Sequence, residues 1–401
     1  MIFIETDPIK IEEIGNIVSK IRGQYTILNY DEEYICNDDE ERGKYRSVVL
    51  HTDSNKLVCI APPMSLTIKC FETKYTNPIP EEIYLDELIE GTMIQLFYDH
   101  DRNEWEIATK KSISGNYSYF ANSTTFRSMT SDAFGEPGVD ISKLSFLSSL
   151  NKKMCYHFIL QHPLNHIVLP IKDPRMVLVS VYEIISKNSA CFISPCEYKK
   201  WDFLESLKEK GIIHYPSVLT IEEDTNSSSY KSIISKHLTI HTPFTTMGLM
   251  FTNVKTGDHC PVVNATYEEA KKLRGNHPNL QYQYLCVRRT GKITEFLKYF
   301  PMYKKMFYGF NNDFCNYAHN LHQAYMQKYV LSSSTEISKK YYYHVKQIHH
   351  TLYLPSLQSG SKIIIRKTIV RDYLDSLDPD VLLHILNYEK LQYVKAFSSS
   401  K

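Results

Sequence analysis

Residues 84–99 read Tyr-Leu-Asp-Glu-Leu-Ile-Glu-Gly-Thr-Met-Ile-Gln-Leu-Phe-Tyr-Asp, a pattern that predicts a strand, a turn at Glu90-Gly91 and a second strand. Glycine suits a tight bend because it has no side chain to collide with a neighbouring strand. Two residues before Glu90 the turn carries Leu88, and no lysine occurs between Lys74 and Lys110. Because leucine has no lone pair, this turn offers no nucleophile for covalent chemistry.

Strand-forming segments with turn residues between them predict three hairpins. They pair residues 47–51 with 57–61, residues 93–98 with 104–109, and residues 158–160 with 167–171. Further strands are predicted at residues 176–185 and 249–254. Strands at this density indicate a large antiparallel sheet system with helical insertions, one of which covers residues 196–210 and ends at Gly211.

The character of the sequence differs at the two ends of this strand-rich region. Near the start, apolar residues recur at helical spacing, namely Ile11, Ile14, Ile17, Val18 and Ile21. Helical periodicity returns over residues 294–300, 307–329 and 341–352. We therefore expect an α+β protein with a helical segment at residues 1–34, a strand-rich domain at 35–275 and a helical C-terminal domain at 276–401.

Composition indicates an ordinary globular protein. Apolar residues make up 43% of the chain and charged residues 23%, and the net charge of +1 argues neither for nor against a polyanionic partner. The chain has thirty tyrosines and only fourteen glycines, which is unusual. Tyrosine suits base-stacking surfaces as well as cores.

Other sequence features bear on compartment and cofactors. The first residues show no signal-peptide pattern and no run of about 18 apolar residues occurs, so we expect a cytoplasmic protein without a membrane span. The nine cysteines form no CxxC pair, which fits a reducing compartment better than disulfides or zinc. The histidines lack helical ligand spacing with acids, so we expect no metal and no cofactor.

Four stretches, in order, resemble the nucleotidyltransferase domain of the bacteriophage T4-type RNA ligases. Residues 44–50 (Lys-Tyr-Arg-Ser-Val-Val-Leu) resemble the arginine-bearing strand, and residues 89–94 (Ile-Glu-Gly-Thr-Met-Ile) resemble the nucleophile turn, Lys-x-Asp/Glu-Gly. Residues 158–169 resemble the third motif, and residues 247–250 with 261–267 the fourth and fifth. The resemblance implies an antiparallel-sheet, ATP-grasp-like ligase domain, here from a large DNA virus.

The positions that carry the chemistry in that family are altered in this chain. In the family a lysine forms the phosphoramide with AMP, two glutamates hold the ribose and a metal, and paired lysines neutralise phosphates. The matching residues here are apolar: Leu88, Ile159, Met247, Pro261 and Val263. Loss of a covalent nucleophile alone typically costs on the order of 10⁶ in rate, so the resemblance implies a retained fold without catalysis.

The same comparison nominates binding residues but no catalytic one. Basic and aromatic residues alternate over residues 284–305, as on nucleic-acid surfaces, although an amphipathic helix with a basic face has the same pattern. The candidate binding residues are Arg46, Glu90, Gly91, Phe97, Trp105, Lys110, Lys111, Gln161, His162, Asn165, His166, Arg288 and Arg289.

Three functions remain open from the sequence. The first is a non-catalytic RNA-binding protein in a viral mRNA or translation-related setting, whose ligand is an RNA 5′ end or a cap stacked on Phe97, Tyr98 or Trp105. The second is an active RNA ligase or nucleotidyltransferase that uses a displaced lysine, Lys110 or Lys74. The third is a scaffold in a viral assembly. The expected partners are RNA, a nucleotide or cap, and viral or translation-related proteins, with no membrane, in the cytoplasm, a viral factory or the virion.

Overall fold

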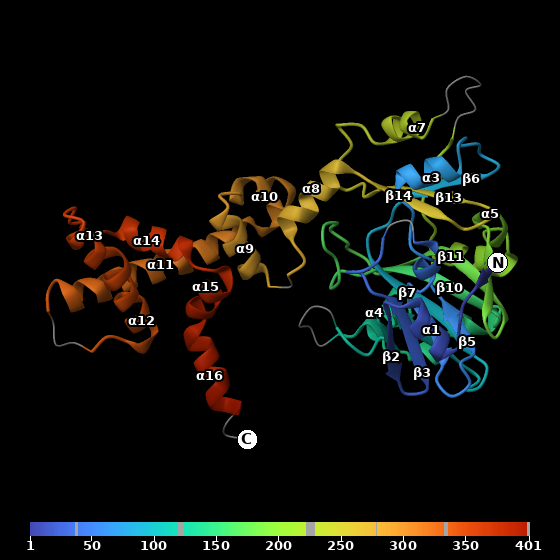
Figure 1. The fold of residues 1–401 in the computed structure, drawn as a ribbon, viewed down its shortest axis with the longest axis horizontal. Coiled ribbons are helices and arrows are strands. Elements are labelled where there is room, and N and C mark those ends of the chain that lie inside the picture. Colours follow the sequence, from blue (N-terminus) through green and yellow to red (C-terminus); the bar gives the residue numbers. More distant parts are fainter. Residues whose placement is uncertain (37–38, 119–123, 222–228, 278, 333–335, 399–401) are drawn as a thin grey trace. The chain divides into compact units, whose positions relative to one another are not determined.

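A computed structural model describes residues 1–36, 39–118, 124–221, 229–277, 279–332 and 336–398 of the chain (Figure 1). The chain divides into two compact units, Met1–Glu269 and Ala270–Lys401. The first unit contains the sheets and the second is helical, which confirms the predicted α+β class. No helix in the described ranges is long and apolar enough to cross a bilayer.

The first unit is built on three sheets whose strands pair antiparallel throughout. The seven-stranded sheet runs in the order β1 (Ile2–Phe3), β12 (Ser189–Ile193), β11 (Arg175–Ser186), β10 (Met154–Gln161), β7 (Thr92–Asp99), β8 (Glu104–Thr109) and β9 (Ser112–Ile113). The four-stranded sheet is β2 (Ile17–Arg22), β3 (Tyr25–Tyr30), β4 (Val48–His51) and β5 (Leu57–Ile60). The three-stranded sheet is β14 (His259–Val263), β13 (Gly248–Asn253) and β6 (Ile83–Glu87).

The turn at residues 88–91 carries the chain from the small sheet into the large one. Strand β6 ends at Glu87 in the three-stranded sheet, and β7 begins at Thr92 in the middle of the seven-stranded sheet. The backbone N–H of Leu88 still donates to the carbonyl of Gly248 at 3.0 Å. Gly91 lies so close to β10 that a Cβ added there would stand 2.4 Å from the carbonyl oxygen of Leu160. Glycine is therefore required for close approach at this crossing.

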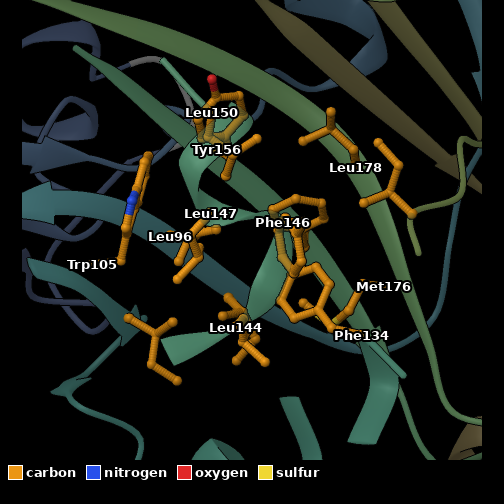
Figure 2. Close-up of a cluster of buried hydrophobic side chains, with 14 of the residues drawn as sticks. Leu96, Trp105, Phe134, Leu144, Phe146, Leu147, Leu150, Tyr156, Met176 and Leu178 are labelled. Atoms are coloured by element: carbon orange, nitrogen blue, oxygen red, sulfur yellow. The ribbon is translucent and has the colours of Figure 1, made fainter. Parts of the chain in front are cut away.

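Alternate residues of β7 face two different cores, because successive side chains of a strand point to opposite faces. Leu96 belongs to the cluster shown in Figure 2, which also contains Trp105, Phe146 and Tyr156. Phe97 faces the other way and packs against residues of the four-stranded sheet. Both layers are needed to bury the central strands of the large sheet.

Buried polar groups fasten the four-stranded sheet to the β7–β8 hairpin. The side chain of Asp99 is fully buried and accepts hydrogen bonds from the hydroxyl of Tyr25 and, at 3.0 Å, from the amide of Gln24. His51 Nε2 lies 3.3 Å from the same carboxylate. Burial alone would raise the pKa of Asp99, but the hydrogen bonds from Tyr25 and from the backbone of residues 101–102 lower it. The carboxylate therefore stays ionised in the core.

Two of the three predicted hairpins are confirmed, and the third is wrong. Strands β4 and β5 pair, as do β7 and β8. Residues 167–171 form no strand, and β10 pairs instead with β7 and β11. The residues after β10 are drawn away from the sheet because their backbone N–H groups bind a buried carboxylate, which is described below.

The prediction of a helical segment over residues 1–34 is also wrong beyond Ile14. Helix α1 covers Pro8–Ile14 and ends at Gly15, which has a positive φ of 70°, as does Asn16 with 55°. The following residues form β2 and β3. The β-branched side chains at Ile17, Val18 and Ile21 favour a strand, and a strand is stabilised here by pairing with β3.

The second unit is built of helices. They are α9 (Leu280–Arg289), α10 (Ile293–Tyr299), α11 (Lys304–Tyr329), α12 (Lys339–Ile348), α13 (Leu354–Gln358), α14 (Lys367–Ser376), α15 (Pro379–Leu386) and α16 (Tyr388–Ser398), with a π-helical turn at His349–Tyr353. The helices predicted near residues 294–300, 307–329 and 341–352 are confirmed. The helix predicted at 196–210 is two shorter ones, α5 (Pro195–Tyr198) and α6 (Asp202–Glu209).

Candidate functional site

Glu90, the acid of the turn at residues 88–91, is held in a cage of hydrogen-bond donors. Its carboxylate accepts the backbone N–H groups of Ile167 at 2.8 Å, Val168 at 3.0 Å and Leu169 at 3.2 Å. The hydroxyl of Tyr267 donates to the same carboxylate at 2.8 Å. Successive backbone N–H groups arranged in this way form an anion-binding nest, and here the anion is the protein's own side chain.

This cage joins three of the four stretches that resemble ligase motifs. Glu90 comes from the nucleophile-like turn, residues 167–169 end the third motif, and Tyr267 ends the fifth. Gln161 adds a bond from its amide to the backbone carbonyl of Glu90 at 3.1 Å. Glu90 is only 4% exposed, so its role is to fix the walls of the site rather than to meet a ligand.

A cavity of about 940 Å³ opens beside this turn. Its floor is apolar and includes Leu88, Ile89, Met93, Ile159 and Met250. Two of these, Leu88 and Ile159, are the residues that the sequence comparison matches to the nucleophile and to an acid of the ligase family. The part of the cavity that they line is hydrocarbon and offers neither a nucleophile nor a carboxylate.

Cationic side chains line another part of the cavity. They are Arg22, Arg46, Lys110 and Lys111. Lys110 and Lys111 share one acid, because their Nζ atoms lie 2.6 Å and 3.6 Å from Glu32 Oε1. Arg46 is different: among the described residues it makes no ion pair or hydrogen bond. A half-buried guanidinium without a partner is costly, and an anionic ligand would relieve that cost.

A second polar group in the cavity is also unsatisfied. Ser180 on β11 is 8% exposed, and its buried hydroxyl has no hydrogen-bond partner in the described part of the chain. His259 lines the same cavity, and burial together with the charge of Arg46 lowers its pKa to about 4. His259 is therefore neutral at physiological pH and can hydrogen-bond a ligand without adding charge.

Asp86 is the one carboxyl in the cavity wall with a strongly shifted pKa among the described residues. Burial raises its pKa to about 7, and the nearby positive charge of Lys199 only partly opposes this. The carboxyl is thus close to half-protonated near neutral pH. Perturbed acids in cavities often mark binding sites, although buried structural acids are perturbed in the same way.

The structure places five of the sequence-predicted residues in the cavity wall: Arg46, Gly91, Lys110, Lys111 and Asn165. Asn165 holds the wall together, since its amide donates to the hydroxyl of Thr92 at 2.8 Å.

Four other predicted residues serve the turn and its surroundings. Glu90 and Gln161 belong to the cage. His162 lies 3.5 Å from Asp132, and His166 contacts the carbonyl of Pro163 at 2.7 Å. These two histidines stabilise the loop after β10 and lie outside the cavity lining.

The predictions that Phe97 and Trp105 bind a ligand are contradicted. Trp105 is 5% exposed and lies in the core cluster of Figure 2, whereas Phe97 is fully buried in the cluster that includes the four-stranded sheet. Tyr98 packs beside Trp105, with ring centroids 5.4 Å apart. These rings are buried against the large sheet, so none of them can stack on a cap.

The two predicted arginines of the helical unit lie in different surroundings. Arg288 is bound by Asp375, with its Nε 2.8 Å from the carboxylate, and its guanidinium lies 3.9 Å from the ring centre of Phe314. Arg289 is exposed and lies 3.9 Å from Asp378. The aromatic residues that alternate with these cations point inward, among them Tyr284, Phe296 and Phe300. This segment is an amphipathic pair of helices with a basic outer face.

Sequence reasoning missed several residues of the cavity. Arg22 was expected in a helix, and Ser180, Tyr182 and His259 lie on strands without a motif around them. The only available signal was strand periodicity: Ser180 and Tyr182 lie two residues apart on β11 and therefore on the same face of the strand.

Neither of the lysines considered as a displaced nucleophile is free. Lys110 is paired with Glu32. The Nζ of Lys74 lies 2.7 Å from the carboxylate of Glu40 and 2.9 Å from that of Asp258. Burial lowers the pKa of Lys74, but the hydrogen bonds to these two acids raise it above its ordinary value. A lysine whose amine is held protonated is a poor nucleophile. In the described ranges no group of three His, Cys, Asp or Glu residues could hold a metal ion.

Replacing Glu90 should destabilise the first unit more than any exposed acid does. Glu90→Ala leaves three buried amides and the Tyr267 hydroxyl without an acceptor, and we expect a loss of about 3–5 kcal/mol in the free energy of unfolding. Tyr267→Phe, which removes one donor only, should cost about 1–2 kcal/mol. Urea unfolding of these variants and of the exposed control Glu209→Ala measures the difference. A Glu90→Ala protein as stable as the control would contradict the cage.

Asp86 should make stability depend on pH. The pKa of Asp86 is higher in the folded protein than in the unfolded chain. Its contribution to the free energy of unfolding is therefore complete below about pH 4, the pKa in the unfolded chain, and is lost as the pH rises through about 7. The unfolding free energy of wild type should therefore fall relative to that of Asp86→Asn as the pH rises, by up to about 1.4 kcal/mol per pH unit in this window. Denaturant titrations from pH 4 to pH 8 measure this. Parallel curves for the two proteins would show that Asp86 titrates normally.

Comparison with known proteins gives partial matches. No protein-family model matches the chain. It is 28% identical over 164 residues to an RNA ligase of Rhodothermus phage RM378, a match that covers 38% of this chain and 36% of the phage protein. It is 26% identical over 216 residues to a homologue of immediate-early protein ICP-46 of Invertebrate iridescent virus 6, over 51% of this chain and 43% of that protein.

Solved structures of an RNA ligase from Naegleria gruberi also align with the chain. One of them covers 53% of this chain and 58% of its own, at 12% identity and a TM-score of 0.39. The matches to the curated relatives thus span less than half the length of each. The sequence of this chain is similar in part to that of a phage RNA ligase, which confirms the resemblance that the motifs indicated.

Proposed function

We propose that this chain is an RNA ligase-like protein of viral origin that binds the 5′ end of RNA without joining it. The proposal rests on the residues that line the cavity. Arg46 lines it and has no partner among the described residues, and Leu88 and Ile159 form part of its apolar lining. The viral origin is inferred from the two relatives, which come from a phage and an iridovirus.

The ligand is inferred from the chemistry of the lining. Arg46 and Arg22 offer charge and hydrogen bonds to a phosphate, and a guanidinium can bind phosphate oxygens bidentately. The apolar floor suits the face of a base or a ribose. Tyr117, which is 38% exposed in the lining, supplies a ring for stacking. We therefore favour a terminal 5′-phosphate, held by cations, over a cap held between two rings.

Catalysis is not part of the proposal. Phosphoryl transfer needs a nucleophile and charge stabilisation of the transferred group, usually by metal ions and lysines. The positions that match these groups are leucine, isoleucine, methionine, proline and valine. The lysines near the cavity are paired with acids.

Binding can be tested with a short RNA that carries a 3′ fluorophore and either a 5′-monophosphate, a 5′-hydroxyl or a methylguanosine cap. Wild type should bind the monophosphate about tenfold more tightly than the hydroxyl form, because a charged hydrogen bond is gained. Arg46→Ala should abolish that preference. The control Arg175→Ala, at an exposed arginine outside the cavity, should keep it.

Two results would overturn the proposal in this form. Equal affinity for all three RNAs would mean that the 5′ end is not read. Tighter binding of the capped RNA, unaffected by Arg46→Ala, would favour the cap instead of the phosphate. Fluorescence anisotropy at low and moderate salt distinguishes these outcomes, since a phosphate contact weakens as salt rises.

The absence of catalysis has a separate test. Incubation with α-labelled ATP should leave no label on the protein, and restoring the amine with Leu88→Lys should not produce one, because the acids and lysines of the other motifs are also missing. A covalent label on wild type that disappears in Lys110→Ala would instead establish a displaced nucleophile.

A further inference from the structure

A stack of aromatic rings lies on the helical unit, away from the segment in which the sequence suggested one. Tyr329 at the end of α11 and His349 in the π-helical turn are parallel within 1°, with ring centres 3.6 Å apart. Tyr353 also stacks on His349, with ring centres 5.1 Å apart and an interplanar angle of 25°. We call Tyr329, His349, Tyr353 and the nearby Tyr342 the aromatic platform.

The inner side of the platform is anchored and its outer side is open. Tyr325 is 3% exposed beneath it, and its hydroxyl lies 3.3 Å from His349 Nδ1. Tyr342 is 46% exposed. The π-helical turn sets His349 and Tyr353 on a common side, and such turns are frequent at functional sites. The rings are therefore fixed before any ligand arrives, which lowers the entropic cost of binding.

Two lysines flank the platform without a carboxylate partner in the described residues. Lys328 Nζ lies 4.3 Å and Lys346 Nζ lies 4.7 Å from the ring centre of Tyr342. The surrounding sequence is strongly basic: residues 314–371 contain a single acid, Glu336. The cations of this segment are Lys328, Lys339, Lys340, Lys346, Lys362, Arg366, Lys367 and Arg371.

We propose that the aromatic platform binds single-stranded RNA, with bases stacked on Tyr342 and on the exposed faces of the Tyr329–His349–Tyr353 stack and phosphates held by Lys328 and Lys346. Flat, preformed rings between cations match a strand of alternating bases and phosphates. The site lies wholly in the helical unit and is independent of the cavity. The choice of RNA over DNA rests on the proposed function.

A protein partner is the competing interpretation. Val330 and Leu331, which follow Tyr329, are 55% and 69% exposed, and such residues are common at protein interfaces. The carboxylate-poor surroundings, and two lysines that have no carboxylate partner in the described residues, favour a polyanion instead. The experiment below decides between the two.

The test uses the full chain and a 3′-labelled oligouridine of twelve nucleotides with a 5′-hydroxyl, so that the cavity's preference for phosphate does not contribute. Tyr342→Ala should weaken binding about tenfold or more, and Tyr342→Phe, which keeps the ring, should stay within about twofold of wild type. The double variant Lys328→Gln/Lys346→Gln should reduce the slope of log affinity against log salt by about one.

Matched controls lie elsewhere on α11. Tyr308→Ala changes an exposed tyrosine, 69% exposed, and Lys305→Gln changes an exposed lysine, and both should bind as wild type does. Unchanged affinity in Tyr342→Ala would overturn the proposal and assign the surface to another partner. Equal binding of duplex RNA would also overturn it, because paired bases cannot stack on the rings. If Tyr342→Ala weakens binding of the oligouridine but keeps the preference for a 5′-phosphate, the platform acts separately from the cavity. The same follows if Arg46→Ala loses the phosphate preference but still binds the oligouridine.

Discussion

The sheet unit depends on one buried charge. The carboxylate of Glu90 is bound by three consecutive backbone N–H groups and a tyrosine hydroxyl, and through them the turn between two sheets is fixed to the loop after β10 and to the start of α8 (Ala265–Arg274). A buried carboxylate is tolerated only with such a set of donors. The cage gives Glu90 and Gly91 structural roles that need no catalysis. The carboxylate binds the loop after β10, and the glycine allows the close approach to β10.

In the proposed function, the cavity beside this turn is a binding site without catalytic groups. The side chains of Leu88 and Ile159 can neither attack a phosphate nor bind a metal ion, but they line an open cavity. Arg46, which has no partner among the described residues, and the buried hydroxyl of Ser180 can both contact a ligand in the cavity. On our two proposals, the cavity binds an RNA end and the aromatic platform of the helical unit binds a strand.

The sequence was informative where local chemistry decides structure. The hairpins at β4–β5 and β7–β8 follow from strand patterns around polar turns, and the long helix α11 follows from its periodicity. It failed where tertiary contacts decide. Residues 167–171 look like a strand, but Glu90 captures their amides. Phe97 and Trp105 were expected at a site, yet alternation along a strand cannot say which of two buried faces is a core. Tyr329 and His349 meet only because α11, α12 and a π-helical turn bring them together.

The central claim, that the cavity holds an RNA end without forming a bond to it, is tested most directly by photo-crosslinking. An RNA with 4-thiouridine as its 5′-terminal, phosphorylated nucleotide would be irradiated with the protein, and the attached peptides identified by mass spectrometry. The account predicts crosslinks within the cavity-lining segments near residues 86–93 and 109–117, and no adduct before irradiation. Crosslinks confined to other segments, or a lysine already carrying a nucleotide in the dark, would contradict it.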